Sequence, residues 1–182
     1  MAYVPLILAA VVVAWFVTAY NKLVRLRNQI KNAWHQIDVQ LKRRYDLIPN
    51  LVEVVKDYMS YEQETLTKVI EARGAALSAK GPAAQAKAEN ALTESLKSLF
   101  AVFENYPDLK ANRNVASLQE ELTGTENKIS FARQFYNDSV MTYNNAIQSI
   151  PSNFVASLFN FAAEAYFETE PESRAVPKAN LR

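Results

Sequence analysis

The first stretch of the chain is apolar without interruption. Residues 3–20 read YVPLILAAVVVAWFVTAY and contain no charged side chain. At about 1.5 Å per residue, a helix of this length spans about 27 Å, close to the ~30 Å core of a bilayer. The alternatives are a buried core helix and a secretory signal peptide, but the basic start and small-residue cleavage site of a signal peptide are missing. The pattern predicts a retained transmembrane anchor over residues 1–20.

Basic residues follow this apolar segment directly, whereas no Lys or Arg precedes it. The positive-inside rule therefore predicts that the N-terminus lies outside and that the body of the protein lies in the cytoplasm. We also expect the basic cluster to contact anionic lipid head groups. Its members are Lys22, Arg25, Arg27 and Lys31.

Beyond the anchor, apolar or small residues recur every three or four positions, as in a helix packed lengthwise against partners. The spacing predicts that the anchor continues into one long helix, bent at Pro49 and broken only at residues 75–82. The recurring positions are Leu23, Leu26, Ile30, Ala33, Ile37, Leu41, Ile48, Leu51, Val55, Tyr58, Thr65, Val69, Ala72 and Ala76.

Two further helices are predicted, over residues 83–103 and 118–147, with a turn at 105–108 between them. Asn112 or Asn114 can cap the later helix, or Ser117 and Glu120 can form a capping box, and Ile150-Pro151 ends it. Short connections make neighbouring helices antiparallel. Pairing Ile147 with Ile30 places Arg43, Arg44 and Asp46 across from Glu126, Lys128 and Arg133. This set is a candidate interhelix polar network, and the alternative is a solvated charged face.

The C-terminal part carries a cluster of aromatic residues. We expect one or two helical turns that cover the membrane-proximal end of the bundle, or a surface for self-association, because large apolar patches seldom stay exposed. The candidate association surface comprises Phe154, Leu158, Phe159, Phe161, Tyr166 and Phe167. Residues 21–168 then form the bundle, and residues 169–182 form an extended or mobile tail.

Composition narrows the possible chemistry. The chain has 3 Gly, no Cys, 1 His and a net charge of +1. These counts argue against a Gly-rich phosphate loop, a thiolate metal site and a nucleic-acid interface. His35 is a lone histidine without the second ligand that a metal site needs. The sequence therefore predicts no catalytic, cofactor-binding or metal-binding residues, and neither nucleic acid nor a small-molecule substrate as partner.

Several blocks of sequence resemble the LemA family of bacterial membrane proteins, in the family's order and over residues 20–168. The resemblance implies an N-terminal anchor and a body of long antiparallel helices, and hence the bacterial inner membrane. It implies no catalytic residues. The blocks are 20–24 (YNKLV), 32–34 (NAW), 40–52 (QLKRRYDLIPNLV), 118–123 (LQEELT), 125–129 (TENKI), 131–133 (FAR), 136–138 (YND), 159–161 (FNF) and 166–168 (YFE).

The sequence as a whole predicts an all-α protein. Its N-terminal transmembrane helix continues into an antiparallel bundle of three main helices plus a short C-terminal helix. The favoured function is a single-pass, membrane-anchored scaffold that is not an enzyme and forms a homo-oligomer at the bilayer. One alternative is an adaptor that regulates another membrane protein, such as a protease or a sensor. The other is a carboxylate-based metal-binding bundle.

Overall fold

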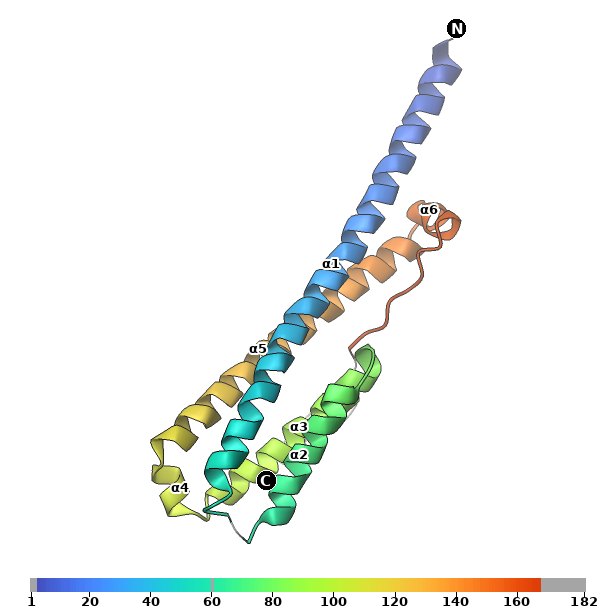
Figure 1. Ribbon diagram of the computed structural model, residues 1–182. Helices are drawn as coiled ribbons and strands as arrows, with labels where there is room; N and C mark the ends of the chain where they lie inside the picture. Colours follow the sequence, from blue (N-terminus) through green and yellow to red (C-terminus); the bar gives the residue numbers. More distant parts are fainter. Residues whose placement is uncertain (1–2, 60, 168–182) are drawn as a thin grey trace, which may run out of the picture. The chain divides into compact units, whose positions relative to one another are not determined.

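The computed structural model describes residues 3–59 and 61–167, so the predicted tail at 169–182 and the last bundle residue, 168, lie outside the described residues. The described part is all-α, as predicted, and contains no strand. Figure 1 labels its helices, which are α1 (Tyr3–Val55), α2 (Gln63–Ser78), α3 (Pro82–Phe103), α4 (Pro107–Ala111), α5 (Arg113–Gln148) and α6 (Ser152–Leu158).

Helix α1 joins the apolar segment to the body without a break, which confirms the predicted continuity. Within the described residues it is the one helix long and apolar enough to cross a membrane. Pro49 lies inside it. The prediction that this helix continues to residue 74 is wrong, because α1 ends at Val55 and α2 begins only at Gln63. Neither Gly nor Pro marks the intervening turn. The backbone N–H of Met59 donates to the carbonyl of Val55, and the Met59 side chain is fully buried.

The described chain divides into two compact units, each with part of α1 and part of α5. The anchor unit, as we call the first, holds residues 3–39 and 129–166. The hairpin unit holds residues 40–59, 61–128 and 167. In the anchor unit α1 and α5 run side by side in opposite directions, and α6 folds back beside α1 (Figure 1).

The register of α1 against α5 in the anchor unit differs from the prediction. Gln29 donates to the hydroxyl of Ser139. The rings of Trp34 and Tyr136 pack edge-to-face, with their centroids 5.4 Å apart. Ile147 packs near Leu23 rather than near Ile30. The helices are therefore displaced by about two turns from the predicted pairing. The apolar spacing fits several registers, and the packing of Leu23 with α6 selects among them.

The hairpin unit takes its name from α2 and α3, which are joined at residues 79–81 and pack together. The predicted apolar face of α3 is buried, at Leu92, Leu96, Leu99 and Phe103. The turn expected at 105–108 instead opens a short helix, α4, with Pro107 in its first turn, where proline is well tolerated. Asn112 caps α5 as predicted, because its Oδ1 accepts from the N–H of Asn114 at 2.9 Å.

Candidate functional site

A buried ionic group lies inside the hairpin unit, centred on Arg44 of α1. Only 2% of its side chain is exposed. Its Nη1 lies 2.7 Å from a carboxylate oxygen of Glu126 on α5 and 3.2 Å from one of Glu89 on α3. Its Nη2 donates to the hydroxyl of Thr93 at 2.8 Å. One guanidinium thus holds three helices of this unit together through charge-assisted hydrogen bonds.

Glu89 is fully buried and has several donors. The hydroxyl of Tyr45 donates to its Oε1, and the side-chain amide of Gln85 donates to the same oxygen at 3.0 Å. Burial, followed by the bond to Glu89, raises the pKa of Tyr45 far above its ordinary value. The phenol therefore stays protonated and serves as a donor to the carboxylate. With these partners, the charge of Glu89 is well compensated in the interior.

The backbone of α1 contributes a further polar contact beside this group. Pro49 has no N–H, so the carbonyl of Tyr45, four residues earlier, lacks its helical donor. The Nε of Arg73 on α2 donates to that carbonyl at 2.8 Å. A second arginine therefore supplies the bond that the proline removes, which agrees with the continuity of α1 through this position.

Of the six residues predicted to form the interhelix network, the structure brings Arg44 and Glu126 together. Arg43 instead meets Glu121, at 3.3 Å on the surface. Asp46 and Lys128 are exposed, and Arg133 is a half-buried residue of the anchor unit.

Sequence reasoning missed Tyr45, Gln85, Glu89 and Thr93, although a signal for two of them was present. Gln85 and Glu89 continue, toward the N-terminus, the spacing of fours and threes that runs through Leu92 and Leu96. Polar side chains at such buried positions need partners. On α1, Arg44 fills the gap between Leu41 and Ile48 in the same way.

The second group of predicted residues lies in the anchor unit, where α6 meets the end of the apolar segment. Val155 and Ala156 of α6 form a buried cluster with Leu23, and Phe16 and Ile147 pack against it. Asn160 takes a positive φ of 54°, and the N–H of Phe161 donates to the carbonyl of Ala156 at 2.9 Å. This is a Schellman-type ending, which turns the chain directly after α6.

That turn brings two of the predicted aromatics onto α1. The ring of Phe159 lies 4.7 Å from that of Tyr20, and Phe161 lies 5.7 Å from the same ring. Phe154 and Leu158 are each 65% exposed, so most of their surface is left uncovered by this packing. Tyr166 is also exposed. Phe167 belongs to the hairpin unit and is buried, so it is not part of an exposed association surface, contrary to the prediction.

The segment after α6 is extended and is held to α5 by side-chain bonds. The hydroxyls of Tyr143 and Tyr136 each donate at 2.9 Å, to the carbonyls of Ala162 and Ala165. The side chain of Asn144 both donates to the carbonyl of Glu164 and accepts from its N–H, each at 3.0 Å. Burial raises the pKa of both tyrosines, so both remain donors at neutral pH.

The four basic residues predicted to contact lipid are all exposed on α1 but differ in their surroundings. Lys22 and Arg25 line a hollow between α1 and the α5–α6 corner. The Nε of Arg27 instead lies 3.7 Å from a carboxylate oxygen of Glu164. Lys31 lies two and a half turns beyond Lys22 and does not line the hollow.

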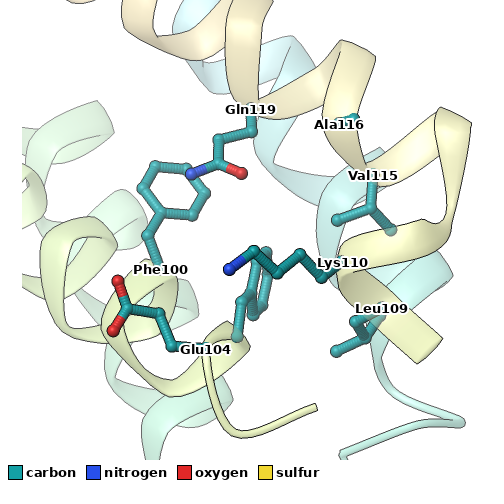
Figure 2. Close-up of a pocket in the computed structure, with 8 residues that line it drawn as sticks. Phe100, Glu104, Leu109, Lys110, Val115, Ala116 and Gln119 are labelled. Atoms are coloured by element: carbon teal, nitrogen blue, oxygen red, sulfur yellow. The ribbon is translucent and has the colours of Figure 1, made fainter. Parts of the chain in front are cut away.

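A smaller hollow, of about 150 Å³, lies in the hairpin unit among α3, α4 and α5. Figure 2 shows the ammonium of Lys110 extending across it, with Phe100 and Glu104 on the opposite side. Its volume is below the ~300–1,000 Å³ typical of cofactor and ligand pockets. Among the described residues, no group of three or more His, Asp or Glu side chains is arranged to hold a metal ion. His35 lies 4.0 Å from Asp38, on the surface of α1.

A comparison with protein families matches residues 33–180 to the model of the LemA family. The chain belongs to the LemA family. It is 27% identical to protein LemA of Metamycoplasma hominis over 169 residues, which are 92% of this chain and 77% of that protein. It is 23% identical to magnetosome protein MamQ 2 of Paramagnetospirillum magneticum over an alignment of 185 positions, which covers 87% of this chain and 68% of the relative. This LemA-family chain is thus a helical protein whose first helix and relatives point to a membrane.

Proposed function

We propose that this chain is a single-pass, membrane-anchored scaffold that assembles with further copies of itself through α5. Its N-terminus lies outside and its helical body lies on the cytoplasmic side of a bacterial inner membrane, according to the charge asymmetry around the anchor. The role is one of binding rather than catalysis. The carboxylates of Glu89 and Glu126, which an acid–base or metal mechanism would need, both bind Arg44.

Two exposed phenylalanines on α5 support this proposal most directly. The residues Phe131 and Phe135 are 73% and 41% exposed, and they lie one helical turn apart on the same side. Tyr136, the neighbour of Phe135, packs against Trp34, which lies 14 residues or about 21 Å along α1 beyond the apolar segment, so a bilayer around that segment does not account for the two phenylalanines. Covering a phenylalanine side chain is worth about 1.5–3 kcal/mol, which favours a partner at this position.

The anchor favours a second copy as that partner. Copies held in one membrane share the same direction and depth, so Phe131 of one chain meets Phe131 of the next at the same height. A two-fold axis along the membrane normal then makes the same patch complementary to itself. Confinement to two dimensions raises the effective concentration of chains and allows a modest contact surface to suffice.

The mass of the full chain, extracted in a mild detergent, tests this proposal. We expect a particle that contains two or more 20.5 kDa chains. We expect the double substitution Phe131→Ser/Phe135→Ser to yield single chains. The matched control is Val39→Ser, which removes an apolar side chain that is 63% exposed on α1, and this variant should still assemble.

A strictly monomeric natural chain at high concentration would contradict self-association, as would a double variant that still assembles. A second protein present in stoichiometric amount would instead support an adaptor that regulates another membrane protein. The orientation has its own test, because the chain has no cysteine. A Ser130→Cys variant should react with a membrane-impermeant thiol reagent only after the cells are permeabilised.

A further inference from the structure

One feature of the anchor unit that the proposed function leaves unexplained is the hollow beside the end of the apolar segment. Its volume is about 480 Å³, which is within the ~300–1,000 Å³ range of ligand pockets. One wall is α1, from Trp15 to Arg25, and the other is the α5–α6 corner around Pro151. The hollow therefore opens at the boundary between apolar and charged residues on α1.

The charge of the hollow is positive. Lys22 and Arg25 lie one turn apart on α1, and none of the described residues that line the hollow is acidic. The nearby Arg27 has a carboxylate partner in Glu164, which does not line the hollow. Two cations on one side of a pocket of this size suit a phosphate group.

The α5–α6 corner beside the hollow is strongly apolar. Ile150 is 80% exposed, and Phe154 and Leu158 are each 65% exposed. The same corner packs on Phe16 and Ala19, so these side chains lie level with the last turns of the apolar segment. Trp15, which lines the hollow, is of the residue type that favours the membrane interface.

We propose that this hollow is a binding site for one anionic phospholipid of the surrounding leaflet. Lys22 and Arg25 bind its phosphate, its acyl chains lie along Trp15 and Ala19, and Ile150, Phe154 and Leu158 enter the apolar layer beside them. The corner is thus a second membrane contact, in addition to the anchor. Helix α6 suits this position because flanking residues bond the main-chain groups at its ends. The N–H of Asn153 donates to the carbonyl of Ser149, and the carbonyl of Ala156 accepts from the N–H of Phe161. The proposal rests on the membrane anchoring of α1 and does not depend on self-association through α5.

The first test counts lipids on the full chain. The protein is reconstituted in nanodiscs of phosphatidylcholine with phosphatidylglycerol, released, and weighed by native mass spectrometry. We expect the natural chain to retain phosphatidylglycerol and the variant Lys22→Gln/Arg25→Gln to retain about tenfold less of it, since each basic group near the surface attracts anionic lipid.

The matched variant Arg27→Gln/Lys31→Gln removes the same charge and should retain the lipid. Equal losses in both variants would overturn the assignment. Inorganic phosphate that displaces the lipid would show instead that the hollow is a site for soluble phosphate.

The second test measures the depth of the corner. Because the chain has no cysteine, Phe154→Cys and Leu158→Cys each carry a single environment-sensitive label. We expect lipid-attached quenchers to reach these labels, whereas a label at the exposed position Ser130→Cys is quenched from water. Labels on α6 that only aqueous quenchers reach would overturn the proposal. Shielding that disappears when the protein is diluted in lipid would also overturn it, and would favour protein–protein contact through α6. Either result is distinguishable from failure of the Phe131 contact, which is measured by particle mass.

Discussion

The side chain of Arg73 donates a hydrogen bond from its Nε to the backbone carbonyl of Tyr45, over 2.8 Å. That carbonyl is the one that the proline at position 49 leaves without a helical donor. Pro49 on α1 removes a backbone donor, and Arg73 on α2 supplies one in its place. This hydrogen bond lies directly beside the buried contacts of Arg44 and Glu89 in the hairpin unit.

The first prediction concerns this arrangement. Replacing Arg73 by Met should lower the free energy of unfolding by about 1.5–3 kcal/mol, the range for hydrogen bonds to charged groups. In a Pro49→Ala background the loss should be smaller, because the new N–H of residue 49 supplies the donor. Urea unfolding of the full chain in detergent measures this coupling. The control Lys68→Met alters an exposed residue of α2 and should have little effect in either background. Equal losses for Arg73→Met in both backgrounds would contradict the explanation.

The second prediction concerns the buried charges. Glu89→Ala should lower the free energy of unfolding by about 3–5 kcal/mol, because it leaves a buried guanidinium with one carboxylate fewer. Glu126→Ala should cost less, about 1.5–3 kcal/mol, because its side chain is 34% exposed. Glu121→Ala, which removes an exposed pair with Arg43, should cost below about 1 kcal/mol. The same unfolding measurement ranks the three, and any other order would count against the network.

The third prediction concerns pH. The pKa of Tyr45 is raised from 10.0 by burial and by Glu89, so the fold favours the protonated phenol. Its stabilisation is fully present below about pH 10 and is lost as the pH rises toward the folded-state pKa. Stability should therefore fall with pH in this range, by up to about 1.4 kcal/mol per pH unit from this group.

Unfolding curves between pH 8 and about 11 check this, since the window brackets the ordinary tyrosine pKa. Tyr45→Phe should make the decline less steep. Tyr61→Phe, which changes an exposed ring, should leave the decline unaltered. If the stability of the Tyr45→Phe chain declined with pH as steeply as that of the natural chain, the phenol of Tyr45 would not be the cause of the pH dependence.

The fourth prediction concerns the α2–α3 connection. Gly81 has a φ of 83°, in the left-handed region that side chains disfavour. Gly81→Ala should therefore cost about 1–2 kcal/mol, although space for the methyl group is available. Gly74 lies inside α2 with the same free space, and Gly74→Ala should stabilise by about 0.5–1 kcal/mol. Thermal unfolding of the two variants should shift in opposite directions, and shifts of the same sign would contradict this explanation.

The positions of most helices could be predicted from local information. The apolar segment at 3–20, the buried face of α3 and the cap at Asn112 depend on residues a few positions apart, and the structure bears out the helices that they predict. The turn after Val55 could not be found in this way. It has no Gly or Pro, and the apolar spacing continues through it, so only the packing of Met59 distinguishes a turn from a longer helix.

The sequence by itself determined that the chain is helical, where its apolar segment lies and which faces of the helices are buried. These properties follow from the period of the helix and from the length of the apolar run. Only the tertiary structure decided that Glu89 pairs with Arg44, that Arg73 donates to the carbonyl that Pro49 leaves without a donor, and that Ile147 packs near Leu23 rather than near Ile30. A polar residue at a buried position needs a hydrogen-bonding partner, but that partner lies on another helix. Which residue becomes the partner depends on the register in which the helices pack, and the register depends on all the contacts between the helices together.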